Sequence, residues 1–237
     1  MNHSPRYQKV NSQILPHKFY SLPESVNFLQ NHNLEKGKRI KVTFTLNWKK
    51  QKGVLIPKSK IVLPYSISPK GKKLAVIKDG LLVETINELS KIKEMELLSI
   101  EETHQRIMAE KTNKIRKKTQ WGFEKLLVHP QNEKKFKEKL PPKLFGLVSR
   151  KVLLAENTLE VVSNFQHGEQ EIRNDGNGNI HVLIGESNYP AEQLEKNYQF
   201  VYNKINSLRP AKWKGIFLKK ITLSTTMGPG LKVYLNS

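Results

Sequence analysis

Cysteine is absent from this sequence, and its absence excludes several kinds of site. Without thiols the chain can form no disulfide, use no cysteine nucleophile and bind no zinc through sulfur. Long apolar runs are missing too, because no stretch approaches the roughly 18 residues that a membrane-spanning helix needs. The first ten residues lack the apolar core of a secretory signal, so any transit peptide is either already removed or was never needed.

Acidic residues are also scarce. The 237 residues include 21 Asp and Glu against 41 Lys and Arg, which gives a net charge of +20 and a pI near 9.9. A field of that sign attracts polyanions, nucleic acid first and an anionic membrane second. The alternative is a soluble surface that is merely rich in lysine, and an imbalance this large disfavours it. We expect nucleic acid as the partner and no membrane.

Catalytic and metal-binding patterns are missing as well. The seven histidines are scattered, and the spacing of His104 and Glu110 does not make the His-Glu-x-x-His zinc pattern. The segment 175–178 is too short for a calcium loop and predicts a turn. No phosphate-cradling glycine loop is present, and no carboxylate pair stands near a plausible nucleophile. We therefore predict that the protein is not an enzyme and uses no cofactor or metal.

The opening of the chain predicts an α+β arrangement. Residues 1–20 are expected to form a weakly ordered basic arm. Ser21 and Glu24 then make a capping box, which predicts a short helix. Residues 39–47 alternate strictly between apolar side chains and a face of basic residues and threonines. That alternation is typical of a strand with one buried face.

The last third of the chain also predicts an α+β arrangement. Strands are predicted over 169–173 and 179–184, around the turn at 174–178. A helix with one apolar stripe follows Pro190. Two further strands are predicted on either side of Thr226-Met227-Gly228-Pro229-Gly230, near the end of the chain.

The middle of the chain alternates strands with helices. Short apolar runs at 72–77 and 126–128 suit strands that are buried on both faces. Helical spacing begins at Leu82, and a second capping box at 99–102 opens a helix that becomes rich in lysine. Another lysine-dense helix is predicted around 133–140. This order predicts an α/β unit with a small parallel sheet.

The most economical arrangement has two domains. Residues 1–63 and 154–237 would form one discontinuous α+β domain, an antiparallel sheet with helices on one face. Residues 64–153 would form an inserted α/β domain, and the two crossings between the domains would act as a hinge.

The glycine-containing turn at 226–230 has two interpretations. It can simply join two strands of a hairpin. It also presents a hydroxyl, a flexible apolar side chain and glycines, which are suited to lie against an RNA sugar edge. The basic strand face with Arg39 and Lys41, and Arg173 beside the earlier turn, would extend one basic surface across the discontinuous domain.

These residues resemble the large-subunit ribosomal protein L-one family. Residues 221–233, ITLSTTMGPGLKV, match its C-terminal signature almost without gaps. Residues 172–185 resemble its hairpin and 190–197 the helix that follows. Lys-Trp-Lys-Gly at 212–215 and Val-Leu-Pro at 62–64 fall where the family has Lys-Gly and Leu-Pro.

The resemblance implies a two-domain protein whose inserted domain is a three-layer, Rossmann-like α/β domain. It implies a structural constituent of the large ribosomal subunit that binds stalk rRNA and assists the release of deacylated tRNA from the exit site, beside other large-subunit components. By resemblance, Thr226, Met227 and Gly228 would contact RNA, with Ser224 before them on the strand. Arg173 matches a basic hairpin position. Lys36, Arg39 and Lys41 complete the expected RNA-binding residues.

The chain departs from the family pattern at several places. Glu186 stands where the family usually has lysine, and Lys36 replaces an aromatic residue. The inserted domain lacks the family's Gly-Pro-Arg-Gly and Pro-Asn-Pro-Lys loop and carries added lysines over 101–140. From this drift we expect a mitochondrial ribosome, with a plastid or the bacterial cytoplasm as alternatives.

Two other functions stay open at this point. The protein could be a translational repressor that binds its own messenger, since that is a second activity of bacterial family members. It could also be a stand-alone RNA-processing factor, although the sequence offers no catalytic set for one.

Overall fold

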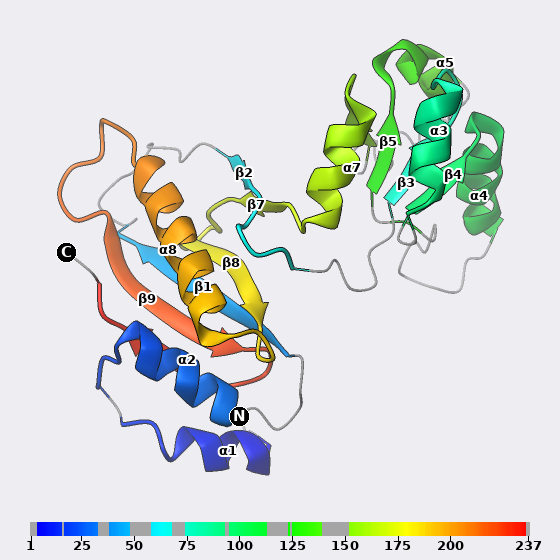
Figure 1. Cartoon of the computed structure of the whole chain (residues 1–237). Helices are drawn as coiled ribbons and strands as arrows, with labels where there is room; N and C mark the ends of the chain where they lie inside the picture. The colour runs from blue at the N-terminus through cyan, green and yellow to red at the C-terminus, as the bar shows by residue number, and fades with distance from the viewer. Residues whose placement is uncertain are drawn as a thin grey trace. The chain divides into compact units, whose positions relative to one another are not determined.

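The computed structural model divides the chain into two compact units (Figure 1). The first unit comprises Met1–Ile67 and His167–Ser237, and the second comprises Ser68–Gln166. The structure describes residues 4–15, 17–32, 38–47, 58–67, 74–92, 95–112, 123, 125–138 and 152–235. Among these residues no helix is long and apolar enough to cross a membrane.

The first unit is built on a four-stranded antiparallel sheet. Its strand order is β10-β9-β1-β8, so the two ends of the chain contribute neighbouring strands. The predicted strand at 39–47 is confirmed as β1. The strands are β1 (Arg39–Leu46), β8 (Asn179–Glu186), β9 (Leu218–Thr225) and β10 (Gly230–Val233).

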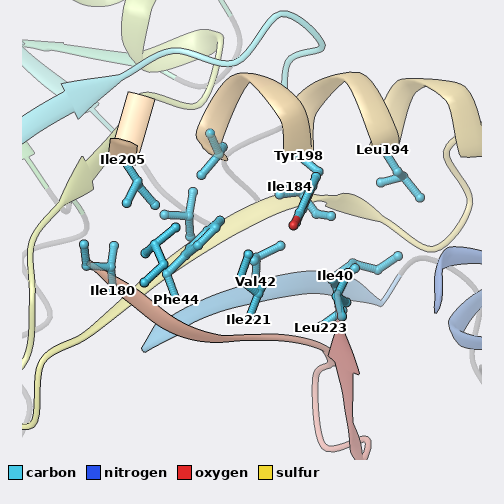
Figure 2. Close-up of a cluster of buried hydrophobic side chains, with 14 of the residues drawn as sticks. Ile40, Val42, Phe44, Ile180, Ile184, Leu194, Tyr198, Ile205, Ile221 and Leu223 are labelled. Atoms are coloured by element: carbon cyan, nitrogen blue, oxygen red, sulfur yellow. The ribbon is translucent and has the colours of Figure 1, made fainter. Parts of the chain in front are cut away.

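Two helices cover one face of this sheet: α2 (Leu22–Asn31) and α8 (Ala191–Ser207). The capping box that starts α2 is present, with Ser21 accepting from the Glu24 N–H and Glu24 accepting from the Ser21 N–H. Figure 2 shows the apolar stripe of α8 lying against the inward side chains of the strands. The shared core includes Ile40, Val42, Phe44, Ile184, Leu194, Tyr198, Val201, Ile221 and Leu223.

Alternation along the strands fixes what the opposite face of the sheet carries. Every second residue of β1 is buried, so its basic residues and threonines lie on the face that α2 and α8 do not cover. We call this the outer face.

One expected pairing is wrong. The segment predicted as the first strand of a hairpin forms β7 (Gln170–Ile172), which pairs antiparallel with β2 (Ser59–Ile61) rather than in a ladder with β8. A single bridge between Asn174 and Ile180 is all that remains of the hairpin ladder. The physical reason is that the Gln170 side chain already pairs with both backbone groups of Leu183, at 2.8 and 2.9 Å.

A buried asparagine stabilises a β-bulge in β8. The register between β1 and β8 shifts after Ile40, so β8 carries an extra residue at Ile184. The Asn197 amide of α8 donates to the Ile184 carbonyl at 2.8 Å. It also bonds the N–H and carbonyl of Tyr65, both at 3.0 Å. Asn197 therefore ties helix, bulge and crossing segment together.

The N-terminal arm is more ordered than predicted. Residues Pro5–Asn11 form helix α1, with Ser4 as N-cap and Pro5 in the first turn. Farther on, Tyr20 bridges to Val233 at the edge of the sheet. The expectation of a weakly ordered arm missed the Ser-Pro start signal, which satisfies free N–H groups of a first helical turn.

The second unit contains a four-stranded parallel sheet of order β4-β3-β5-β6. The predicted strand before Asp79 is confirmed as β3, which is buried on both faces. The strands are β3 (Leu74–Ile77), β4 (Met95–Leu98), β5 (Lys125–Val128) and β6 (Val152–Leu154). The helices are α3 (Val83–Ser90), α4 (Ile100–Thr112), α5 (Glu133–Glu138) and α7 (Thr158–Gln166), with a 3-10 turn at Pro130–Asn132.

Alternate residues of β3 belong to two separate apolar clusters. Leu74 and Val76 pack in one cluster with α3 and α7, through residues such as Leu89 and Phe165. Ala75 and Ile77 pack in the other, which includes Ile107 of α4 and Phe136 of α5.

The connections between the units lie close together within the first unit. The predicted domain boundaries follow residues 63 and 153, whereas the chain passes between the units after Ile67 and after Gln166. The second boundary lies later than predicted because α7 packs with the parallel sheet. Helix α7 ends at Gln166, and Gly168 has a φ of +73°. A Cβ at Gly168 would lie 2.3 Å from the Ile67 carbonyl oxygen, so only glycine fits there.

Candidate nucleic-acid interface

The turn between β9 and β10 is closed by one backbone hydrogen bond, from the Gly228 N–H to the Thr225 carbonyl at 3.0 Å. Met227 occupies the third position of this turn with a φ of +65°. Its side chain is 87% exposed, the most exposed of the large apolar residues that the structure describes. The sequence thus places a large apolar side chain at the tip of a turn, in a backbone conformation that favours glycine or asparagine.

Such a conformation is costly for methionine, about 1–2 kcal/mol. An exposed side chain gains little from the fold that could offset this cost. Met227 is therefore not explained by the stability of the hairpin, and strained residues of this kind cluster at sites of recognition.

Gly228 has a different role from the conformational one that glycine usually has in turns. Its φ is not in the left-handed region, but a Cβ there would lie 2.2 Å from the Thr225 Oγ1. A side chain at this position would therefore need the Thr225 hydroxyl to move. Whether the missing side chain also admits RNA backbone stays a prediction.

The turn is attached to the start of β1. The Thr226 N–H donates to the Arg39 carbonyl at 3.1 Å, and the Thr226 hydroxyl donates to the same oxygen at 3.4 Å. The fold therefore brings Thr226 and Arg39 together, although 187 positions separate them in the sequence.

Cross-strand pairs continue this surface over the outer face. Ser224 lies beside Lys41 on one side and Gly230 on the other. In the next row Thr43 stands between Thr222 and His181, and Thr222 also faces Lys232. The structure therefore brings together Thr226, Met227, Gly228, Ser224, Arg39 and Lys41 of the predicted residues.

Sequence reasoning missed three members of this face: Lys220, Thr222 and Lys232. Lys220 pairs with Thr45, and Lys232 pairs with Thr222. Each alternates with a buried neighbour such as Ile221, so strand periodicity could have found them.

Two predicted residues stand apart. Arg173 is exposed and follows β7, next to the Asn174–Ile180 bridge. That bridge lies near the start of β8, whereas Glu186, the partner of Arg39, ends the strand. By the usual rise per residue, Ile180 and Glu186 are about 20 Å apart. Lys36 lies outside the described residues, as do residues 113–122 of the lysine-rich additions that were expected over 101–140.

Acidic groups limit the basic surface at both ends. Glu186 pairs in register with Arg39 and is buried. At the other end, Asp175 lies 3.5 Å from the His181 Nε2. N–H groups of Asn179 and Asn177 donate to the Asp175 carboxylate and lower its pKa, so it stays ionised at neutral pH.

Chemically, this surface can bind a polyanion but shows no catalytic constellation in the part of the chain described. Lysine and arginine suit phosphates, hydroxyls suit ribose, and the Met227 side chain suits an apolar sugar or base face. Within the same residues, no cluster of three or more His, Asp or Glu could hold a metal ion.

A sheet with one basic, hydroxyl-bearing face and a protruding turn is typical of a nucleic-acid-binding protein. Residues 22–229 match the profile of the Ribosomal protein L1p/L10e family, so the chain belongs to this family, the same L-one family that its motifs resemble. It is a structural ribosomal protein and not an enzyme, as predicted. The alternative of a stand-alone RNA-processing factor is therefore excluded.

Two curated relatives align with nearly the whole chain, and a third aligns with about a third of it. The "Large ribosomal subunit protein uL1" of Thermosipho africanus is 28% identical over 98% of this chain and 96% of its own length. The protein of that name from Mycoplasma capricolum is 28% identical over 97% of each. The one from Histophilus somni is 44% identical over 32% of this chain and 34% of its own length. These relatives are bacterial; they favour the bacterial alternative and give no support to the mitochondrial expectation.

Proposed function

We propose that the first unit binds the rRNA of the large-subunit stalk through the turn at 226–229 and the adjoining outer face. The observation that carries this proposal is Met227, exposed and held in a strained conformation beside a row of cations and hydroxyls. Strain at an exposed apolar residue is understandable if the side chain is buried when RNA is bound.

Within this interface each residue has a distinct task. Arg39 and Lys41 pair with phosphates and position the RNA. Thr226 and Ser224 hydrogen-bond ribose hydroxyls, which distinguishes RNA from DNA. Met227 packs on a sugar or base face and excludes water from these hydrogen bonds.

We further infer that the second unit is the inserted three-layer, Rossmann-like domain. Its two apolar clusters, one on each face of the parallel sheet, support this assignment. In this proposal it moves on the paired crossings at Ile67 and Gly168 and assists the release of deacylated tRNA, in contact with other large-subunit components. The host particle would be a bacterial-type ribosome in the bacterial cytoplasm, and cosedimentation with its large subunit is the expected result.

Binding to a transcript of the stalk rRNA tests the interface. Met227→Asp places a negative charge at the tip of the turn and should weaken binding at least 10-fold without unfolding the protein. Ile216→Asp is the matched control, because Ile216 is 70% exposed but lies beyond the other end of β9. Equal affinities of the two variants and the wild type would contradict the proposal.

The salt dependence of RNA affinity is a second test of the same interface. Each phosphate neutralised by a cation releases counterions, so the logarithm of the affinity should fall steeply and linearly with the logarithm of the salt concentration. Lys41→Gln and Lys232→Gln should each make that slope shallower by about one. An affinity that is insensitive to salt would argue against phosphate contacts on this face.

A further inference from the structure

Beside the Thr-Met-Gly turn lies a hollow of about 380 Å³ that the proposed function does not use. One wall is the turn itself, from Thr225 to Pro229. The other walls come from α1 and α2. Its volume falls within the range of sites that hold a small ring system.

Three aromatic side chains line the hollow on the side of the helices. They are Tyr7 of α1, Phe28 of α2 and His32, the C-cap of α2. The rings of Phe28 and His32 are stacked, with centroids 4.1 Å apart and planes 20° from parallel. The His32 Nδ1 lies 2.9 Å from the Phe28 carbonyl, which can only accept, so Nδ1 carries the proton of that bond. Nε2 is then the ring nitrogen that can meet the edge of a ligand.

Charge selects among possible occupants. Lys38 lines the hollow, and none of the described lining residues is acidic. Polar atoms of Ser4, Thr225 and Thr226 interrupt the apolar lining. A flat ring with hydrogen-bonding edges, attached to an anionic chain, matches this combination of stacking surface, polar edge and positive charge.

We propose that this hollow receives one unpaired nucleobase of the RNA that binds at the neighbouring turn. The proposal rests on the proposed function, because Thr226 and Met227 belong both to the interface and to the wall of the hollow. RNA held on those residues passes the mouth of the hollow. The base stacks against the aromatic side chains of α1 and α2, and the His32 Nε2 meets its edge. Helix α1 thereby becomes part of the RNA-binding surface.

Abasic scanning of the stalk rRNA transcript tests this inference. Synthetic RNAs that lack one base at each unpaired position in turn are titrated with wild-type protein and with His32→Ala. At one position, loss of the base should weaken wild-type binding roughly 10-fold, the scale of one stacked base. The same abasic RNA should bind His32→Ala no more weakly than the intact RNA does.

Two further variants complete the design. Tyr7→Leu should give the same result as His32→Ala: the abasic RNA should bind this variant no more weakly than the intact RNA does. Because Tyr7 belongs to α1, this result would show a loss of stacking without any disturbance of α2. Phe200→Ala removes an exposed aromatic side chain of α8 that does not line the hollow and should leave the whole abasic profile unchanged.

The possible results separate the inference from the function on which it rests. If Met227→Asp weakens binding but no abasic position couples to His32 or Tyr7, the hollow holds no base and the inference is wrong, while the interface stands. Hollow variants that bind RNA normally but fail to bind another ribosomal protein would also overturn it. If Met227→Asp binds like wild type, the proposed function itself fails.

Discussion

Met227 allows stability and recognition to be separated in one position. Replacing it with glycine removes a left-handed strain of about 1–2 kcal/mol. Part of this gain is offset, because glycine gives the unfolded chain more entropy, worth about 0.4–1 kcal/mol. Met227→Gly should therefore be more stable than wild type by about 0.5–1 kcal/mol, although it removes the side chain that we assign to RNA.

The expected loss of affinity comes from the same exposed side chain. Burying a methionine completely is worth about 1.5–3 kcal/mol. Met227→Gly should therefore bind stalk rRNA about 10- to 100-fold more weakly, since 1.4 kcal/mol corresponds to a factor of ten. Met227→Ala is the matched control, because it removes the side chain but keeps the strained backbone. It should lose the same affinity and gain no stability.

Urea unfolding followed by circular dichroism, and filter binding at one fixed salt concentration, measure the two quantities. The reasoning would be refuted if Met227→Gly were less stable than Met227→Ala, since the strain would then not exist. It would equally be refuted if both variants bound RNA as tightly as wild type.

Two predictions concern the scaffold. Asn197→Ala leaves the bulged carbonyl of β8 and two backbone groups of the crossing segment without partners, so it should cost about 2–4 kcal/mol and lower Tm by roughly 5–15 °C. Gln199→Ala, exposed on the same helix, should melt like wild type, and equal melting of both would contradict this role. At acid pH the capping box of α2 should weaken. The Ser21 N–H lowers the Glu24 pKa below its ordinary 4.5, so the carboxylate stabilises the fold above that pH and loses its effect as pH falls through the lowered pKa. Glu24→Gln should flatten this part of the melting profile, and an unchanged acid profile would show that the cap does not contribute.

Much of the first unit could be predicted because its local signals agree with its tertiary contacts. The alternation in β1 and the Ser21–Glu24 capping box both point to the structure that forms. In the second unit, the strands β4 and β6 were missed, because each is a run of only three or four residues that is mostly half-buried. The partner of β7 could not be read from the turn that follows it, since a side chain, Gln170, occupies the edge of β8.

Six of the predicted residues lie together in the structure, while their part in RNA binding stays a prediction. Motif and charge located the turn and the basic strand. The sequence suggested glycine as the conformationally special residue, whereas Met227 carries the positive φ and a Cβ at Gly228 would only crowd the Thr225 hydroxyl. The attachment of Thr226 to Arg39 depends on strand order, which local patterns do not encode.

Site-specific photo-crosslinking tests the central claim most directly. A photoreactive phenylalanine analogue is placed at Met227 in one protein and at Ile216 in another, and each is irradiated with the stalk rRNA transcript. We predict a crosslink to RNA from position 227 and none from position 216. RNA crosslinked only from position 216, or from neither, would show that the turn does not face the RNA.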